Sequence, residues 1–420
     1  MKRILLLAGG LYICLSVCTV RAQVNDPNQV AQDAAATHAN NDMDIAADKG
    51  LNKAGQGIGN LFKKKKEKGS AKSGTPASGP AVPEGNQKNP NASLSQEPPI
   101  KTYQNYDFVA GDKIIFEDDF ISDQDGEFPA HWELKKGQGA VNKQQGFQTF
   151  TLTDGNYVVV NPRVSTESYL GNEFTVEWDV YSEAGSYGTH LFFHLPAVTE
   201  DQDADLSINK DEVSYNSQDA NIDMNGSLPS DIAGDNHINK WHHIAVGYKN
   251  KQIKVYVDQY RVLVVPDCKM VFGSLSFGGS ASQDAPILFK DVKMASGGSQ
   301  NMIGNILTNG KFVTHGITFD IDKAVLRPES MGVLNELAKF LKENGSVNME
   351  IDGHTDNSGA AAHNLTLSQQ RADAVKAQLL SMGIDGARLS TKGFGDTRPN
   401  ADNGSPEGRA NNRRVEFVKK

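Results

Sequence analysis

Short stretches in which apolar and polar residues alternate fill the chain between residues 103 and 296. The clearest of them are 174–181, 190–194, 241–248, 252–258 and 286–292. Turn-forming residues such as Asn250 and Gly273 separate or follow these stretches. Successive side chains of a strand point to opposite faces, so a period of two without a long helical segment predicts an all-β sandwich over 103–296.

A helical period begins after a junction rich in Gly, Ser and Asn at 296–306. Two apolar sets recur at intervals of three and four residues: Leu334, Leu337, Ala338 and Leu341, then Ala372, Val375, Leu379 and Met382. Each set predicts a helix with one buried face. We expect Gly345 to end the first helix in a left-handed conformation, and Thr366 with Gln369 to form a capping box near the start of the second.

Four strands are predicted around these helices. The first carries Val313, Ile317 and Phe319, the second carries Val347, Met349 and Ile351, and the other two are 388–394 and 413–418. A short helix is expected at 406–411, between the last two strands. The order β-α-β-α-β-α-β predicts an α+β domain over 310–420, with its helices on one face of a sheet.

The first 22 residues have the composition of an export signal peptide. A basic start (Lys2, Arg3) precedes an apolar run at 4–18, and small residues stand at the −3 and −1 positions before Gln23. This predicts an exported protein cleaved after Ala22. An uncleaved anchor is the alternative, although the run is shorter than the roughly 20 residues that span a bilayer. Lipidation of Cys18 is a second alternative, because 15–18 resembles a lipobox apart from its Val.

Residues 23–100 are rich in Ala, Asn, Gly, Ser and Pro, which predicts a disordered linker. Apolar residues over 47–61, followed by four Lys at 63–66, leave a weak amphipathic helix on anionic lipid as an alternative. Four Gly between 50 and 59 disfavour that helix.

Bulk composition excludes several classes of function. The 420-residue chain has a net charge of −9, which disfavours nucleic acid as a partner. Without the first 22 residues Cys268 is the single cysteine, so no intramolecular disulfide can form. No spacing singles out a pair of carboxylates in the sandwich, and no Gly-x-Ser-x-Gly motif is present, so we expect neither catalysis nor a cofactor.

One acidic loop in the sandwich has metal-like spacing. Its oxygen-bearing residues are Asp201, Asp203, Asp205, Ser207, Asn209 and Glu212. The spacing mimics a calcium-binding EF-hand loop, but Leu206 stands where that loop needs Gly. A solvated acidic loop is the alternative, and we assign no metal site.

The stretch from Ile351 to Arg371 places an acid and a base on either side of a polar loop. Asp356 follows the predicted second strand, and Arg371 lies on the second helix. If the two side chains are not paired with each other, they form a clamp for a group that carries both an ammonium and a carboxylate. Arg suits the carboxylate because its planar fork donates two hydrogen bonds. The alternative is a private salt bridge between them.

Residues 312–420 resemble the OmpA-like peptidoglycan-binding domain. The matching pieces are 319–320, 353–359, 364–372, 393–395 and 407–415. The resemblance implies that Asp356 binds the side-chain ammonium of diaminopimelate and Arg371 its carboxylate. It further implies that Asn364, Thr355, Asp320 and Arg413 line the same pocket. Arg414 neighbours Arg413, so one of the two is expected to reach the pocket and the other to pair structurally.

The sandwich resembles laminin-G and concanavalin-like jelly rolls over residues 239–258. The resemblance implies binding of a glycan, for which Trp132, Tyr187 and Tyr215 are candidate stacking residues, or docking of an envelope protein. Together these patterns predict a periplasmic protein, associated with the cell wall and the outer membrane, that tethers the wall to the outer membrane or to a membrane complex. The alternative is a surface or periplasmic glycan-binding protein that its C-terminal domain retains at the wall.

Overall fold

The computed structural model describes residues 106–196, 204–297 and 302–420. The predicted signal peptide (1–22) and linker (23–100), including Cys18, lie outside the described residues. The described residues belong to one compact unit. Within it we call residues 106–297 the β-rich region and residues 302–420 the C-terminal region.

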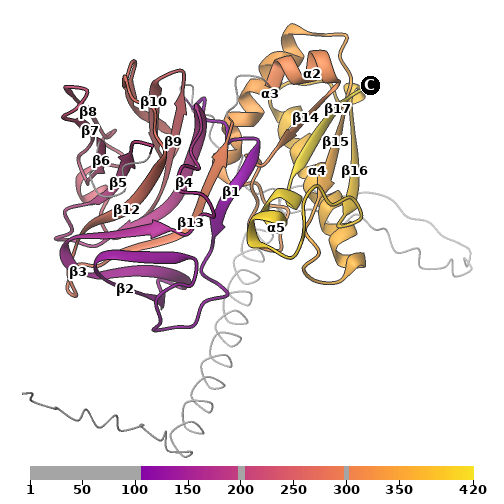
Figure 1. The fold of residues 1–420 in the computed structure, drawn as a ribbon. Helices are drawn as coiled ribbons and strands as arrows, with labels where there is room; N and C mark the ends of the chain where they lie inside the picture. The colour runs from indigo at the N-terminus through magenta and orange to yellow at the C-terminus, as the bar shows by residue number, and fades with distance from the viewer. Residues whose placement is uncertain (1–105, 197–203, 298–301) are drawn as a thin grey trace, which may run out of the picture. The chain divides into compact units, whose positions relative to one another are not determined.

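The described residues of the β-rich region form thirteen strands and one 3₁₀ turn, η1 (Gly234–Asn236). The strands are β1 (Lys113–Asp118), β2 (Trp132–Gln144), β3 (Phe147–Pro162), β4 (Glu173–Ser182), β5 (Thr189–His194), β6 (Ala204–Ile208), β7 (Glu212–Ser217), β8 (Ile222–Ser227), β9 (Trp241–Lys249), β10 (Gln252–Val257), β11 (Tyr260–Val265), β12 (Ser274–Ala281) and β13 (Ile287–Ser296). Each of the five stretches with alternating residues coincides with a strand, and no α-helix interrupts the described part of this region (Figure 1).

The strands are hydrogen-bonded in the order β11-β10-β9-β4-β13-β3-β12-β5-β6-β7-β8, with β1 paired to β13 and β2 to β3. The period of two shows in the burial of β6: Ala204, Leu206 and Ile208 lie in the main apolar core, while the residues between them are only partly buried. Strand β4 departs from it, because both of its faces are buried. Its Val176 and Trp178 face the core, while Glu177 and Asp179, on the opposite face, are buried polar residues.

Two of the three proposed sugar-stacking aromatics are core residues. Trp132 and Tyr215 have no exposed surface, so their assignment to a glycan site was wrong. Their rings pack in the apolar core because they stand at the inward-facing positions of their strands. Tyr187, by contrast, is 79% exposed.

The described half of the calcium-like loop is a β-hairpin. Asp205 and Ser207 lie in β6, and Asn209 Oδ1 accepts hydrogen bonds from the backbone N–H groups of Asp211 and Glu212. Glu212 lies in β7, where its carboxylate accepts a hydrogen bond from Asn225. These oxygens are therefore used in the turn and between strands, and do not converge on one point. Asp201 and Asp203 lie outside the described residues.

The C-terminal region is a four-stranded sheet with helices packed on it (Figure 1). Its elements are α2 (Met302–Asn309), β14 (Lys311–Thr314), η3 (Pro328–Ser330), α3 (Met331–Glu343), β15 (Met349–His354), α4 (Ala361–Ser381), η4 (Gly386–Arg388), β16 (Leu389–Gly395), α5 (Pro406–Asn412) and β17 (Val415–Lys419). The strand order is β14-β17-β15-β16; β15 and β16 are parallel, and the other pairs are antiparallel.

Several local predictions in the C-terminal region were wrong. The first strand ends at Thr314, so Ile317 and Phe319 follow it in a loop. Helix α4 begins at Ala361, which places Thr366 inside the helix, where its hydroxyl donates to the Ala362 carbonyl (3.0 Å). Helix α3 is capped by Asn344, whose side chain donates to the Phe340 carbonyl (2.9 Å), so Gly345 does not end it in a left-handed conformation. The intervals between apolar residues located both helices but not their termini.

The segment that leads into β1 packs against the C-terminal region. Tyr106 and Phe108 belong to the same apolar cluster as Met331 and Val333 at the start of α3. A Cβ on Gly332 would lie 1.7 Å from the Phe108 carbonyl oxygen, so only glycine allows the two backbones to approach this closely. Burial of each large apolar side chain in this cluster contributes about 1.5–3 kcal/mol.

No described helix combines the length and apolar character needed to cross a bilayer. Cys268 is buried and forms no disulfide.

Candidate functional site

Glycines in the sheet allow helix α4 to lie close to it. A Cβ on Gly353 would lie 2.2 Å from the Ser368 carbonyl oxygen, and one on Gly393 would lie 2.4 Å from the Gln369 nitrogen. Without side chains at these positions, α4 lies directly on β15 and β16. The loop between β15 and α4 is tied to β16, because Thr355 N–H donates to the Gly395 carbonyl (3.0 Å).

Asp356 is a buried acid whose two carboxylate oxygens are both engaged. Oδ1 accepts the Ser358 backbone N–H (2.9 Å), and Oδ2 accepts Nη1 of Arg413 (2.6 Å). Burial alone would raise the pKa of this carboxyl group, but the bonds from Arg413 and Ser358 outweigh it and lower the pKa below its usual value. Asp356 is therefore a stable anion at neutral pH.

Arg371 is anchored through one end of its guanidinium. Its Nε donates to the Lys323 carbonyl (2.9 Å), and the guanidinium carbon lies 5.0 Å from the centre of the Phe319 ring. Its Nη1 and Nη2 make no hydrogen bond with any residue that the structure describes. Burial and the nearby charge of Arg413 lower its pKa. Asp356 and Arg371 therefore form no salt bridge with each other; Asp356 pairs with Arg413.

Asn364 and Thr355 are both buried beside Asp356. The Asn364 side-chain amide donates to the Asp356 carbonyl (3.2 Å), so it fixes the backbone of the loop. The Thr355 hydroxyl is buried and has no hydrogen-bond partner among the described residues. A buried hydroxyl without a partner is costly, which makes it a candidate hydrogen-bonding group, as donor or acceptor, for a ligand.

Asp320 lies in the loop that follows β14, at the edge of the site. Its carboxylate is 3.5 Å from the Lys323 ammonium and is 43% exposed. The same loop is tied to α4, because Asp322 lies 2.5 Å from Nε2 of His363. The loop thus holds the Lys323 carbonyl against Arg371, although the Asp320 carboxylate itself contacts neither Asp356 nor Arg371.

The two neighbouring arginines at the end of α5 have different environments. Arg413 reaches Asp356, whereas Arg414 is buried and donates to Glu416 (2.8 Å) and to the Arg398 carbonyl (3.0 Å). His354 is buried with its ring stacked on Phe394.

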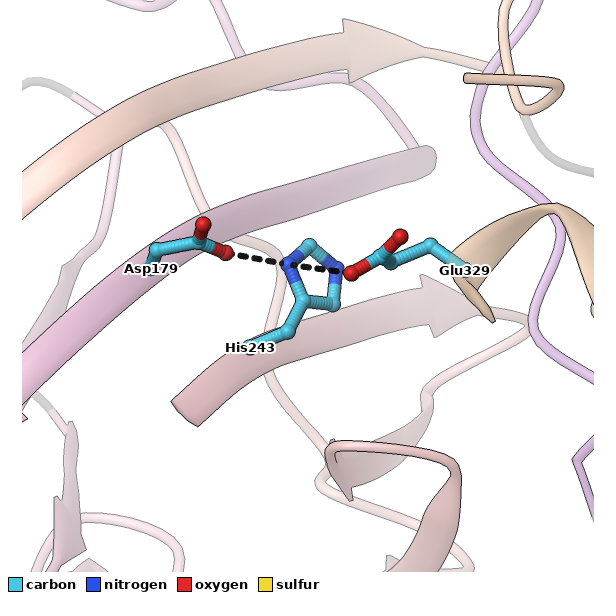
Figure 2. Close-up of side chains that lie close together, drawn as sticks. All are labelled: Asp179, His243 and Glu329. Carbon is cyan, nitrogen blue, oxygen red and sulfur yellow. Dashed lines mark hydrogen bonds and ion pairs between the residues drawn. The ribbon is translucent and has the colours of Figure 1, made fainter. Parts of the chain in front are cut away.

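A second charged cluster, Asp179–His243–Glu329, is the one set of described residues spaced to hold a metal ion (Figure 2). His243 Nδ1 lies 2.7 Å from Asp179 Oδ1 and 3.9 Å from Glu329 Oε1. The other Asp179 oxygen accepts bonds from Lys290 and from Arg327 Nη2 (3.0 Å). Two permanent cations on one of three ligands repel a metal ion, so the cluster is an ion network between β4, β9, β13 and η3.

His243 is cationic in this network. Burial opposes its protonation, but the carboxylates of Glu329, Asp179 and Glu177 outweigh that cost and raise its pKa to about 10. The alternation that predicted β4 and β9 could not reveal the network, because Glu329 and Arg327 come from the distant C-terminal region.

Comparison with known proteins concerns the C-terminal region. A model of the OmpA family matches residues 318–413. This part is 46% identical over 100 residues to outer membrane porin F of Pseudomonas fluorescens, covering 24% of this chain and 31% of that protein. It is 40% identical over 114 residues to the probable lipoprotein YiaD of Escherichia coli, covering 27% and 51%.

A third relative is the peptidoglycan-binding protein ArfA of Mycobacterium tuberculosis, 44% identical over 107 residues, covering 25% of this chain and 33% of that protein. The chain thus spans 31–51% of the length of these three relatives. Among solved structures, the peptidoglycan-associated lipoprotein from Burkholderia pseudomallei is 30% identical, with 25% of this chain and 88% of that chain covered and a TM-score of 0.24. Residues 318–413 of this chain are therefore a domain of the OmpA family.

Proposed function

We propose that the protein binds peptidoglycan non-covalently, through the diaminopimelate of the stem peptide. The Asp356 carboxylate would accept hydrogen bonds from the side-chain ammonium of diaminopimelate, and Arg371 would bind the side-chain carboxylate of diaminopimelate. The names of ArfA and of the Burkholderia lipoprotein associate relatives of this domain with peptidoglycan. We therefore propose that this chain, like these relatives, associates with peptidoglycan, and we assign it neither a catalytic activity nor a cofactor.

The observation that carries this proposal is the state of Arg371. Its Nε is fixed on the Lys323 carbonyl, while its two Nη groups have no hydrogen-bond partner among the described residues. A carboxylate that approaches the guanidinium end-on would receive two parallel hydrogen bonds, one from Nη1 and one from Nη2. The ionised Asp356 and the unpaired Thr355 hydroxyl supply acceptors for an ammonium nearby.

At the level of the cell, we propose that this domain tethers the wall to the outer membrane or to a membrane complex, with the protein in the periplasm. The support is that several relatives are named as outer membrane proteins or lipoproteins. The β-rich region would then dock the membrane-side partner.

A second candidate is a glycan-binding protein that the OmpA-like domain retains at the wall, with the β-rich region as a jelly roll. One observation favours it: Tyr187 is 79% exposed. An exposed aromatic ring can stack on a sugar. A glycan array probed with the full chain carrying Arg371→Ala would detect this activity without wall binding.

The experiment for the main proposal is co-sedimentation of the purified full chain with isolated sacculi. We expect Asp356→Ala and Arg371→Ala each to lose most of the binding. Lys342→Ala and Glu343→Ala, which remove an exposed base and an exposed acid on α3, are the matched controls and should bind like the wild type. Full binding by the Asp356 and Arg371 variants would refute the clamp.

A further inference from the structure

Arg413, which holds Asp356, also contacts an acid from the β-rich region. One of its Nη groups donates to Asp356, and the other donates to Glu117 of β1. Glu117 precedes residues 318–413, so it is not part of the OmpA family match. The Glu117 side chain is 18% exposed, and Asp356 is 10% exposed. Two partly buried carboxylates therefore share one guanidinium beside the proposed ligand site.

The contact rests on a fixed junction between β1 and α5. The side-chain amide of Asn411 donates to the Ile114 carbonyl and accepts the Ile114 N–H, both at 3.0 Å. Ile114 also packs with Ala410 and Ala295 in a small apolar cluster. Since Arg413 follows α5 directly, this junction places it opposite the strand that carries Glu117.

Glu117 is itself held in position from the side of the sheet. It pairs with Lys293 in the antiparallel register of β1 and β13, and the Lys293 ammonium lies 3.6 Å from Glu117 Oε1. The carboxylate thus has a cation on each side, and its place is set by strand pairing rather than by a mobile loop.

The charges around the site show what Glu117 contributes. Arg371, Arg413 and Lys293 carry positive charges, and Asp356 and Glu117 carry negative charges. Without Glu117, Arg413 would pair with Asp356 alone and both Arg371 and Lys293 would be in excess, so the site would favour a simple anion. With Glu117, part of the Asp356 charge remains available to attract an ammonium.

We infer that Glu117 is a positioning residue of the proposed peptidoglycan site, which Asp356 and Arg371 form. By sharing Arg413, Glu117 keeps Asp356 available for the ligand's ammonium. The site is therefore selective for a zwitterion. This inference rests on the proposed function. It also means that the ligand preference of the OmpA-like domain depends on the β-rich region that precedes it.

The test compares two ligands with the same carbon skeleton. Diaminopimelate has ammonium groups and pimelate has none; binding of each to the full chain is measured by calorimetric titration or by displacement from sacculi. For Glu117→Gln we expect diaminopimelate binding to fall by about three- to tenfold while pimelate binding stays equal or improves. Glu117→Asp, which keeps the charge, should recover part of the selectivity.

Glu133→Gln removes an exposed acid on β2 and is the matched control, and thermal unfolding of each variant checks the fold. An unchanged ratio of the two affinities in Glu117→Gln would overturn the inference, and so would tighter binding of diaminopimelate, since Glu117 would then be a competitor of the ligand. In both cases loss of binding by Asp356→Ala would still support the proposed function. A wild type that binds neither sacculi nor diaminopimelate would instead refute the function itself.

Discussion

Two charged clusters contain residues from both the β-rich and the C-terminal regions, and they differ in how completely their groups are paired. In the network of Asp179 and His243, each guanidinium and ammonium has a carboxylate partner. At the proposed peptidoglycan site, the one hydrogen bond that the Arg371 side chain makes with a described residue is from its Nε to the Lys323 carbonyl. A buried network in which each cation has a carboxylate partner is costly to break, whereas an arginine fork without a partner is available to a ligand. Substitutions should therefore separate the two clusters by their effects on stability and on binding.

The largest effect on stability is expected for Asp179→Ala. The substitution would leave His243, Lys290 and Arg327 without their shared carboxylate in a buried place. We expect a loss of about 3–5 kcal/mol in the free energy of unfolding, because breaking a buried pair leaves uncompensated charge. Urea denaturation measures it. A loss below about 1 kcal/mol would show that water screens the charges of the cluster, as it does for an ion pair on the surface.

His243→Gln should lower stability by about 2 kcal/mol at pH 6, with the loss depending on pH. The carboxylates of Glu329, Asp179 and Glu177 raise the pKa of His243 to about 10, above its unfolded value of about 6.5. A raised pKa gives stability that is fully present below pH 6.5 and is lost as the pH rises towards 10. The difference in unfolding free energy between wild type and variant should shrink over this window. A difference that is constant from pH 6 to pH 10 would mean that His243 is neutral in the fold.

Arg371→Lys should affect ligand binding but leave the stability of the fold almost unchanged. Lysine keeps the positive charge but cannot donate the planar pair of hydrogen bonds, so we expect about tenfold weaker binding to sacculi, equivalent to about 1.4 kcal/mol. The free energy of unfolding should change by less than about 0.5 kcal/mol. Unaltered binding would show that the site needs only a positive charge at this position.

Lys323→Ala should have the smallest effect. The residue contributes its backbone carbonyl to Arg371, while its exposed ammonium lies 3.5 Å from Asp320. We expect a change of less than about 0.5 kcal/mol in both sacculus binding and unfolding. A clear loss of binding would place the ammonium of Lys323, and with it Asp320, among the groups that contact the ligand.

The sequence predicted most elements of the C-terminal region from the local order of apolar residues, but it missed α2, which lies partly in the stretch interpreted as a junction. Helices α3 and α4 follow from apolar residues three and four apart, and their buried faces include Leu334 and Leu379. Their ends depend on single hydrogen bonds, which is why Thr366 and Gly345 were misassigned. Alternation located five of the thirteen described strands of the β-rich region. It did not locate β2 and β7, which carry Trp132 and Tyr215 into the core.

Local patterns predicted the site only where its residues are close in sequence, and the family resemblance added Arg413. Asp356 and Arg371 flank one loop, so their neighbourhood follows from a strand–loop–helix pattern. The sharing of Arg413 between Asp356 and Glu117 joins residues 57 and 296 positions apart, and no local pattern contains that information. The ion network is long-range for the same reason, since Arg327 is 148 positions from Asp179.

The most direct test of the central claim is the binding of the wild-type chain to peptidoglycan of two kinds, one with diaminopimelate and one with lysine at the same position of the stem peptide. Lysine supplies the ammonium but lacks the side-chain carboxylate that Arg371 would bind. We predict strong co-sedimentation with the diaminopimelate sacculi and little with the lysine sacculi. Equal binding to both would contradict a site that binds the ammonium and the carboxylate together.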